Sequence, residues 1–344
     1  MKRTATKKNT IFGRVYVAAR AVAYEIFAAV SRCLFGRRAN NAAKLSAGKK
    51  RKLAFYLAMS ALPLIQFCIF YLYVNVNSVL MSFQRYDYKA GAYLGLGFDN
   101  FARVFRDIKT AADIQLAFKN SFILYAFALG IGTTLSVLFS YYMYKKAAGS
   151  RVFKIALFLP SILSAVALVT LYRYFVELGI PAVWKLVFNK EIPGLIFVPE
   201  TRFQTILFFS IWTGFGTTVL MYTGAMGSIN ESVVEAAKLD GAGAFRELIH
   251  VTLPSIYHTL VTFIIMGIAG LFLNQMNVFT FYGVLAPTDV YTIGYFIFRN
   301  TQANTATLAD YPYIAAFGIL LTVVLVPVAL TVKKLLEKFG PSTD

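Results

Sequence analysis

The 344-residue sequence has few charged residues and very few that bind metals or form disulfides. Only 15% of its residues are charged, whereas a soluble domain of this length carries roughly a quarter. Its two cysteines, Cys33 and Cys68, are too few for a disulfide framework, and with two histidines they match no metal-ligand spacing. We therefore expect no metal site and interpret both cysteines as ordinary apolar residues.

Carboxylates are scarce where catalysis or ion coupling would need them. The long apolar stretches hold none near their centres, whereas proton- or sodium-coupled transporters usually carry such groups at mid-depth. The paired acids or His/Asp cluster of an intramembrane hydrolase or glycosyl transferase are also missing. No Gly-rich loop ends in Gly-Lys-Ser/Thr, so we expect no cofactor in this chain, no enzyme activity, and any ATP hydrolysis in another chain.

Apolar residues are abundant and clustered. The sequence is 58% hydrophobic, and six stretches offer about 18 or more residues without a charge, enough to cross roughly 30 Å of hydrocarbon. They lie within 53–83, within 120–144, at 155–172, from 203 towards 226, within 255–281, and at 311–332. This pattern predicts an all-α integral membrane protein with about six transmembrane helices.

The positive charge gathers in the N-terminal region. Of a net charge of +18, residues 1–52 contribute 14 lysines and arginines against one acid, Glu25. Beside hydrophobic spans this indicates a cytoplasmic tail facing anionic lipid rather than a nucleic-acid partner. Apolar residues at helical spacing over 11–35 predict an amphipathic helix on the inner membrane surface, because a span would place Arg20 and Glu25 near the bilayer centre.

Loop charge predicts the orientation of the chain. The tail 1–52, the segment 144–154 and the residues after the sixth stretch are basic, whereas the alternate loops 85–113 and 177–202 are balanced. Since basic loops face the cytoplasm, both termini and the segment 228–254 are expected there. We therefore expect a basic tail (1–52), a transmembrane domain (53–338) and a short C-terminal tail (339–344).

The charged segment 231–255 interrupts the apolar stretches. Ser232 and Glu235 have the spacing of a capping box, and Ser228 and Glu231 offer an alternative. We expect a short helix over about 232–239 that stops at Gly241, because glycine accepts the left-handed conformation of a helix end.

A second short helix is expected to begin near Ala242 or Gly243. Phe245, Leu248, Ile249 and Thr252 would form its apolar face, and Pro254 would mark the joint with the fifth span. Helices this short are marginal in water alone, so they need a surface to pack against. The segment is either a docking element for a soluble partner or an ordinary amphipathic connection on the membrane.

The stretch "EAAKLDGAGAFRELIHVTLP" resembles the EAA motif of permease subunits of ATP-binding-cassette (ABC) importers. The family pattern is Glu-Ala-Ala, three residues, Gly, nine residues, Ile, one residue, Leu-Pro. In this chain it falls on Glu235, Ala236, Ala237, Gly241, Val251, Leu253 and Pro254. Val251 replaces the usual Ile.

Looser resemblances extend over most of 53–338. "FDNFARVF", "LAFKNSF" and "RVFKIALFLPSILSAVALVTLYRYF" resemble maltose, multiple-sugar and glycerol-phosphate permeases, and the Asp240-Gly241-Ala242 run is typical of that carbohydrate branch. The chain departs from the branch at "FYGVLAP" (281–287), where Thr-x-Gly-Gly-Pro is common.

The resemblance implies a type I ABC importer permease in a bacterial cell membrane. Its partners would be a second permease subunit in a heterodimer, two ATPase subunits that bind ATP and Mg²⁺, and an extracellular or periplasmic solute-binding protein. Glu235 would pair with a basic ATPase residue, Phe245 and Leu248 would anchor the contact, and span five would tilt about Pro254. The expected coupling residues are Glu235, Ala236, Ala237, Asp240, Gly241, Phe245, Leu248 and Pro254.

Polar and aromatic residues within the spans are the candidates for a sugar pathway. Asn274 and Asn277 would share one helix face, and Gln275 lies between them. These amides would either bind substrate hydroxyl groups or hydrogen-bond one helix to another. The aromatics Tyr172, Trp212 and Tyr222 would either stack on sugar rings or serve packing and interfacial roles. Alternatives to sugar import are an ABC permease for another polar solute, a secondary transporter, or a membrane scaffold.

Overall fold

The computed structural model describes residues 47–302 and 307–341. The chain divides into two compact units, Met1–Val76 and Asn77–Asp344. The surface helix expected over 11–35 and Cys33 lie outside the described residues.

Helix α3 (Ala47–Gln66) of the first unit continues through a π-helical segment, η2 (Phe67–Tyr73), into α4 (Val74–Ser82), where that unit ends. The stretch Ala58–Ser82 is long and apolar enough to cross a membrane. It lies inside the first predicted span, and the basic residues 49–52 precede it, as the positive-inside rule favours.

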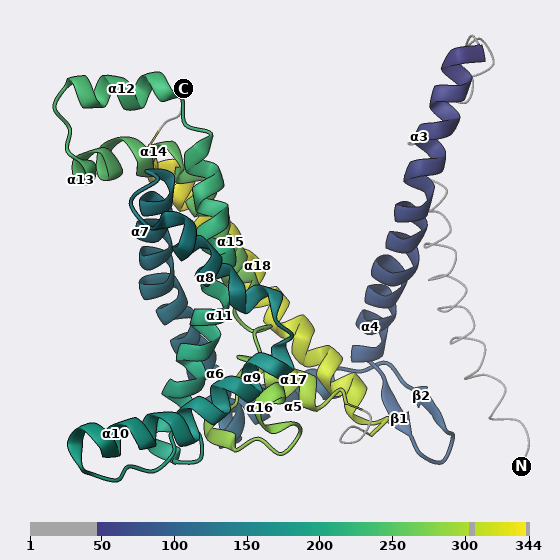
Figure 1. The fold of residues 1–344 in the computed structure, drawn as a ribbon. Helices are drawn as coiled ribbons and strands as arrows, with labels where there is room; N and C mark the ends of the chain where they lie inside the picture. The colour runs from purple at the N-terminus through teal and green to yellow at the C-terminus, as the bar shows by residue number, and fades with distance from the viewer. Residues whose placement is uncertain (1–46, 303–306, 342–344) are drawn as a thin grey trace, which may run out of the picture. The chain divides into compact units, whose positions relative to one another are not determined.

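The second unit begins within α4, and a small hairpin that the sequence did not indicate follows. Strands β1 (Arg85–Asp87) and β2 (Ala92–Leu94) pair antiparallel, with Tyr86 opposite Tyr93. Helix α5 (Asp99–Thr110) follows and packs against α18. Both elements lie at the same end of the unit as α10, here called the α10 end (Figure 1).

The second span forms as predicted but begins earlier. Helix α6 (Ala112–Phe127), the π-helical η3 (Ala128–Gly132) and α7 (Thr133–Tyr144) make one stretch, Ala112–Tyr144. Lys146 and Gly149, at φ +52° and +79°, then turn the chain sharply into α8.

The prediction of one helix over 155–172 is wrong. Helix α8 (Ser150–Ile162) ends at Leu163, which is extended, and the Ser164 side chain caps α9 (Ala165–Tyr174) by accepting from Ala167 N at 3.2 Å. A serine that bonds the next turn competes with helix continuation, which the apolar pattern does not reveal. The chain continues through η4 (Phe175–Gly179) and α10 (Ile180–Phe188), so the candidate span is Ala165–Phe188.

Helix α11 (Pro199–Gly227) is the fourth span and packs against α7 and α8. At its crossing with α8, a Cβ on Gly216 would collide with the carbonyl oxygen of Leu157. Glycine at this position therefore lets the two helices approach closely.

The fifth predicted span, within 255–281, is a bent and shorter element. The helical stretch Ala244–Ser255 and α15 (Tyr257–Gly270) meet at a bend of 69°. After Gly270 the chain turns into the short helices α16 (Val278–Tyr282), η6 (Thr288–Val290) and α17 (Ile293–Arg299) at the α10 end. The last span is α18 (Asp310–Phe339).

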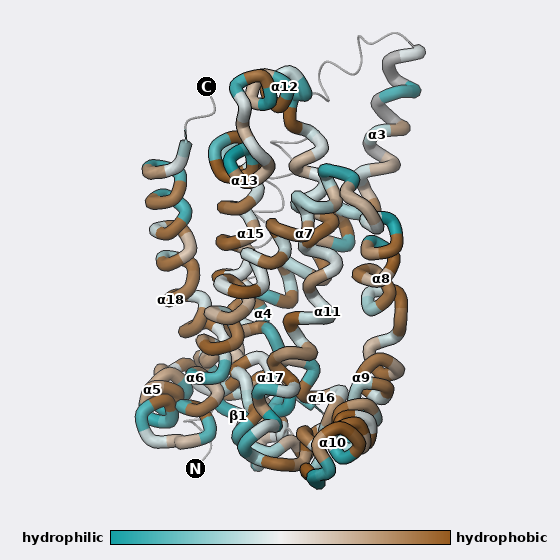
Figure 2. Tube along the Cα trace, turned by 60° about the vertical axis from the view of Figure 1, so that its left-hand side comes forward, coloured by the Kyte–Doolittle hydropathy of each residue, from teal (hydrophilic) through white to brown (hydrophobic). Residues whose placement is uncertain are grey.

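Within the described residues, five helices can cross a membrane, or six if the bent pair is one span. This agrees with the predicted all-α membrane fold of about six spans, apart from the small hairpin. In Figure 2 the hydrophilic residues gather at the end that holds α12 (Glu231–Leu239) and at the α10 end. One apolar core joins α6, α9, α11 and α16–α18, and a smaller one lies beneath α13 (Ala244–Glu247).

Candidate functional site

The first half of the charged segment is a capped helix, α12. Its N-cap is Asn230, whose side-chain oxygen accepts from the Ser232 backbone N at 3.1 Å and from its hydroxyl at 3.0 Å. Neither predicted capping box forms, because the N-cap is Asn230 and not Ser228 or Ser232, and the Asn230 side chain itself bonds the first turn. Glu235 and Ala236 are exposed on this helix, and Ala237 is half-buried.

Gly241 ends α12 as the sequence predicted, at φ +75°. The N–H of Ala242 donates to the carbonyl of Ala237, and the N–H of Gly241 donates to that of Lys238, both at 3.0 Å. These two bonds form a Schellman motif around the C-cap residue, Asp240. The turn exposes Asp240 and directs the chain back towards the membrane-spanning helices (Figure 1).

The second half differs from the single amphipathic helix that the sequence predicted. Helix α13 gives way to a π-helical turn, η5 (Leu248–Thr252), and then to α14 (Leu253–Ser255). Leu248 and Thr252 are buried, whereas Phe245 is 72% exposed and Ile249 40% exposed. Leu248 therefore packs inside the protein, and its expected role as an anchor for a partner is corrected: only Phe245 of that pair faces outward.

The outward face of α12 and α13 carries large apolar groups beside charges. Leu239 is 89% exposed and Phe245 72% exposed, with Glu235 and Asp240 also exposed nearby in sequence. We call Glu235, Ala236, Leu239, Asp240 and Phe245 the α12–α13 surface. Exposed apolar residues rimmed by polar ones are typical of protein interaction sites.

The joint with span five lies two residues beyond Pro254. Pro254 takes the first turn of α14, where a proline needs no N–H partner, and the bend of 69° falls at Ile256. Ile256 is 2% exposed and leaves the helical conformation at φ −97° and ψ 9°. The expected joint at Pro254 is therefore shifted to Ile256.

Behind the α12–α13 surface, an ion pair joins α13 to the end of α7. Lys145 Nζ lies 2.5 Å from Glu247 Oε1 and 2.6 Å from Oε2. The Glu247 side chain is 3% exposed and that of Lys145 27% exposed. Tyr141, one turn earlier on α7, donates its hydroxyl to the carbonyl of Ala244 at 2.9 Å. The sequence did not indicate this contact, because its residues are a hundred positions apart.

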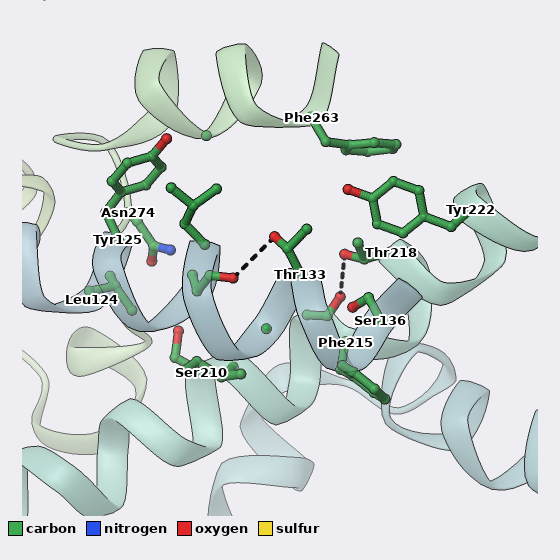
Figure 3. Close-up of a pocket in the computed structure, with 16 residues that line it drawn as sticks. Leu124, Tyr125, Thr133, Ser136, Ser210, Phe215, Thr218, Tyr222, Phe263 and Asn274 are labelled. Carbon is green, nitrogen blue, oxygen red and sulfur yellow. Dashed lines mark hydrogen bonds between the residues drawn. The ribbon is translucent and has the colours of Figure 1, made fainter. Parts of the chain in front are cut away.

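A cavity of about 240 Å³ lies between the spans (Figure 3). Its walls come from α6, η3 and α7, from α11 and from α15, with Asn274 following the last of these. It is lined by Leu124, Tyr125, Ala128, Leu129, Gly132, Thr133, Ser136, Ser210, Ile211, Gly214, Phe215, Thr218, Tyr222, Phe263, Gly267 and Asn274.

The cavity wall combines hydroxyl groups and aromatic rings with aliphatic side chains and glycines. None of the sixteen described residues lining it carries a charge. Thr133 and Thr218 donate only to helix carbonyls within their own turns, of Ala128 at 3.4 Å and Gly214 at 3.2 Å. Tyr222 is fully buried, stacks edge-on with Phe263 at 5.0 Å, and turns its hydroxyl into the cavity (Figure 3).

The hydroxyl of Tyr222 has no hydrogen-bond partner among the described residues. A buried polar group without a partner is uncommon, because it forgoes the bonds that it made with water. Since this hydroxyl faces the cavity, a polar molecule bound there would satisfy it. The wall can thus bind an uncharged, hydroxyl-rich ligand and place an apolar face against Phe215 or Phe263.

The structure brings two of the six predicted pathway residues, Asn274 and Tyr222, to the cavity. The shared helix face expected for Asn274 and Asn277 is wrong, because the helix ends at Gly270 and Asn277 has a left-handed φ of +56°. Gln275 lies in the same turn, away from the cavity lining.

The other two aromatics, Tyr172 and Trp212, lie outside the cavity lining. Tyr172 donates to the carbonyl of Thr205 at 2.9 Å and packs on Phe209, with ring centroids 4.8 Å apart. Trp212 lines a separate apolar groove formed by α11 and by side chains of the stretch 127–139. Their contacts with neighbouring rings are those of the packing role, one of the two readings that the sequence allowed.

The cavity residues that the sequence missed carry a recognisable spacing. Thr133 and Ser136 are three apart in span two, and Ser210, Gly214 and Thr218 are each four apart in span four. Such spacing puts small hydroxyl residues on one helix face. It could have marked both cavity walls.

A network at the α10 end holds Asn274 in place. Thr292 donates its hydroxyl to the Asn274 carbonyl at 2.8 Å, and the Asn274 side-chain oxygen accepts from Met276 N at 2.8 Å. The adjoining segment is fastened by Asn120, which donates to the carbonyls of Asp289 and Tyr291 at 2.8 and 2.9 Å. Asn274 therefore presents its side-chain NH₂ group from a fixed turn.

An ion pair completes this network. Arg202 Nη1 lies 2.9 Å from Asp289 Oδ2 and 3.0 Å from Oδ1, and its Nε donates to the Ile196 carbonyl at 2.9 Å. Tyr282 donates its hydroxyl to the same carbonyl at 2.9 Å, and burial raises the pKa of Tyr282 to about 12, so it stays a donor at neutral pH. Among the described residues no group of three or more His, Cys, Asp or Glu could hold a metal ion.

Comparison with known proteins matches this chain to a protein family. The family model described as "Binding-protein-dependent transport system inner membrane component" matches residues 128–339, well over half of the chain. The match contains the cavity walls of α7, α11 and α15 as well as the α12–α13 surface.

Two curated relatives cover most of the chain. The polygalacturonan/rhamnogalacturonan transport system permease protein YteP of Bacillus subtilis is 25% identical over 297 residues, 83% of this chain and 88% of the relative. The glucose import system permease protein GlcT of Saccharolobus solfataricus is 25% identical over 278 residues, 78% and 94% of the two chains.

A solved structure has the same fold. A chain from a bacterial ABC transporter involved in the import of the acidic polysaccharide alginate superposes with a TM-score of 0.69 at 21% identity. The match covers 85% of this chain and 98% of that one.

Proposed function

The chain belongs to the family of inner membrane components of binding-protein-dependent transport systems, and from that membership we propose that it forms half of the import pathway for a carbohydrate. It acts as a permease subunit, with ATP and Mg²⁺ bound by a separate ATPase. The observation that carries the carbohydrate assignment is the uncharged, hydroxyl-lined cavity with the unpartnered Tyr222 hydroxyl.

Carbohydrate fits the cavity by its chemistry. A sugar offers hydroxyl groups that both donate and accept, which the side chains of Tyr222, Asn274 and Thr218 can match. Its apolar ring faces suit the aromatic wall. The names of the relatives, a polygalacturonan/rhamnogalacturonan permease and a glucose permease, point to the same substrate class.

Coupling to ATP hydrolysis is assigned to the α12–α13 surface. Its exposed Leu239 and Phe245 suit an apolar cleft on the ATPase, and Glu235 suits a basic residue there. The Schellman turn at Gly241 gives this surface a defined shape, and the helix bend at Ile256 connects it to span five. Ala236, Ala237 and Asp240 complete the proposed contact, and Pro254 begins the turn that leads to the bend.

The complete transporter in this proposal contains a second permease subunit in a heterodimer, two ATPase subunits, and an extracellular or periplasmic solute-binding protein. Both termini, the tail 1–52 and the residues after 338 face the cytoplasm of a bacterial cell. In support, Lys145 contacts Glu247, and Tyr257 donates to the carbonyl of Leu336 at 2.8 Å, so the basic segment 144–154, the basic end of α18 and the α12–α13 surface share one end of the second unit.

Uptake of labelled saccharides tests the proposal. Cells lacking this chain should lose uptake of at least one saccharide from a panel of neutral and acidic oligosaccharides, and the wild-type chain should restore it. Affinity purification of the chain should yield a complex that hydrolyses ATP. Unchanged uptake across the whole panel contradicts the carbohydrate assignment, whereas a complex without ATPase activity contradicts the coupling assignment.

A further inference from the structure

Glu247 is the one acid of the segment 231–255 that turns away from solvent. Glu231, Glu235 and Asp240 are exposed, whereas the Glu247 side chain is 3% exposed. A carboxylate in such a position needs a cation, because leaving it unpaired and buried is strongly unfavourable. Lys145 supplies that cation at 2.5 and 2.6 Å from the two carboxylate oxygens.

Two further contacts make this junction rigid. Tyr141, one helical turn before Lys145, donates to the carbonyl of Ala244 at 2.9 Å. Leu248, next to Glu247, is buried with Val137 and Tyr141 of α7 and with Tyr222 and Met226 of α11. An ion pair, a hydrogen bond and an apolar cluster thus hold α13 against the ends of two spans.

Those two spans also form the cavity wall. Thr133 and Ser136 belong to α7; Thr133 lies about 12 residues, or roughly 18 Å along the helix, from Lys145, and Ser136 lies between them. On α11, Tyr222 belongs both to the cluster around Leu248 and to the cavity lining. A displacement of α13 would therefore move the cavity wall through its packing against α7 and α11. It would also act through the covalent connection at the bend at Ile256.

We propose that Glu247, through Lys145, is a positioning residue that clamps the α12–α13 segment to α7, so that movement of this segment shifts the α7 wall of the cavity. The proposal rests on the ATPase coupling proposed above. In this proposal the movement of α12 and α13 reaches the cavity through a lateral contact with span two, and not only through the covalent connection to span five at Ile256.

The chemistry of the clamp suits this task better than apolar packing would. An apolar contact can be remade in a shifted register by repacking, whereas a buried carboxylate and ammonium keep one register, because any slip separates the charges. Packed elements held in this way move as a body between discrete arrangements. Helices α13 and α7 must therefore move together, or the Lys145–Glu247 ion pair must break.

A cysteine reporter on the cavity wall tests the clamp. In a chain carrying Cys33→Ser and Cys68→Ser, Thr133→Cys places a thiol on α7 in the cavity. The full complex is purified, and the rate of maleimide labelling is compared without nucleotide and with ATP plus vanadate. With the ion pair intact, we expect the rate to change about fivefold or more, the usual lower range of coupling between sites.

Glu247→Gln and Lys145→Met should lose most of this change while retaining the bound ATPase. Lys185→Met is the matched control, because Lys185 pairs with Glu191 at 2.6 Å where both side chains are exposed at the α10 end. It should leave the change intact. The double variant Lys145→Met/Glu247→Leu removes both charges, so no buried charge is left unpaired. It replaces a single variant in the test if that variant fails to fold.

The outcomes separate the clamp from the proposed function. If a folded Glu247→Gln or double variant shows the same labelling change as the parent, the clamp is overturned while ATPase coupling stands. If the parent chain itself purifies without ATP hydrolysis, the proposed function fails and the clamp fails with it. A change that is lost in both unpaired variants, with ATPase still bound and Lys185→Met unaffected, supports the clamp.

Discussion

At the scale of single residues, two buried tyrosines show how similar side chains take different roles. Tyr172 donates its hydroxyl to the carbonyl of Thr205 and packs among aromatic rings. Tyr222 is also buried, but its hydroxyl faces the cavity without a partner in the described part of the chain. The difference predicts opposite consequences when each hydroxyl is removed.

Tyr222→Phe should leave stability unchanged or slightly higher, because it removes a polar atom that makes no bond in the unliganded protein. The same change should weaken saccharide binding by about 1 kcal/mol, and so raise the apparent KM for uptake roughly fivefold. Thermal unfolding in detergent and uptake kinetics measure the two effects.

Tyr172→Phe is the matched control. It removes a hydrogen bond of 2.9 Å and should cost about 1 kcal/mol of stability without changing the apparent KM. If the two variants behave alike in both assays, Tyr222 has no special relation to the substrate.

At Gly241 we expect a substitution to act through the backbone conformation and not through a lost side-chain contact. Its φ of +75° is left-handed, and a β-branched residue there would cost about 1–2 kcal/mol and loosen the Schellman turn. Gly241→Val should therefore reduce the amount of ATPase that purifies with the chain, measured as the ratio of the two subunits.

Gly243→Ala provides the comparison for that variant. Gly243 has an ordinary φ of −69°, and an added Cβ meets nothing within 4 Å. It should retain the parental subunit ratio, and an equal loss in both variants would mean that the left-handed turn is not what matters.

At the scale of elements, a close helix crossing decides how α8 packs on span four, α11. An added Cβ at Gly216 would overlap the backbone of Leu157 on α8, and backbone cannot move aside as a flexible side chain can. Gly216→Ala should lower the free energy of unfolding by about 1–3 kcal/mol, seen as a lower unfolding temperature in detergent.

Gly224→Ala tests whether the crossing or the helix composition is responsible. Gly224 lies in the same helix, and an added Cβ meets nothing within 4 Å there. Because alanine is the better helix former, this variant should be stabilised by about 0.5–1 kcal/mol. Destabilisation of both variants to the same degree would contradict the crossing argument.

Element boundaries were the part of the fold least accessible from the sequence. The apolar run 155–172 carries no charge, yet a serine at 164 caps a new helix inside it. The run 255–281 is equally apolar, yet its helix ends at Gly270 because the following turn bonds to Thr292 through the Asn274 carbonyl. Hydropathy measures transfer into lipid, which does not depend on whether the helix is continuous.

At the scale of the whole molecule, charge and fold together predict a sidedness. The turn after α12, which holds Asp240, and the end of α18, which holds Lys338, lie at the α12 end of the second unit; the β1–β2 turn with Lys89 and the end of α10 with Asn189 lie at the α10 end (Figure 1). The basic loops belong to the former, so that end should face the cytoplasm.

Single cysteines measure this sidedness in a chain without its two natural ones. In right-side-out vesicles, an impermeant maleimide should label Lys89→Cys and Asn189→Cys, while Asp240→Cys and Lys338→Cys should react only after the membrane is opened. Labelling of Asp240→Cys in sealed vesicles would reverse the proposed orientation.

The sequence by itself determined the membrane class, the number of spans and the family, because these depend on composition, run length and a spaced motif that are properties of the chain alone. It also determined the left-handed end of α12 at Gly241, a local backbone requirement. Only the tertiary structure decided which polar residues share the cavity, that Leu248 turns inward, and that Lys145 meets Glu247. Those contacts join residues from different spans, and packing between helices, not periodicity along one, sets which side chains meet.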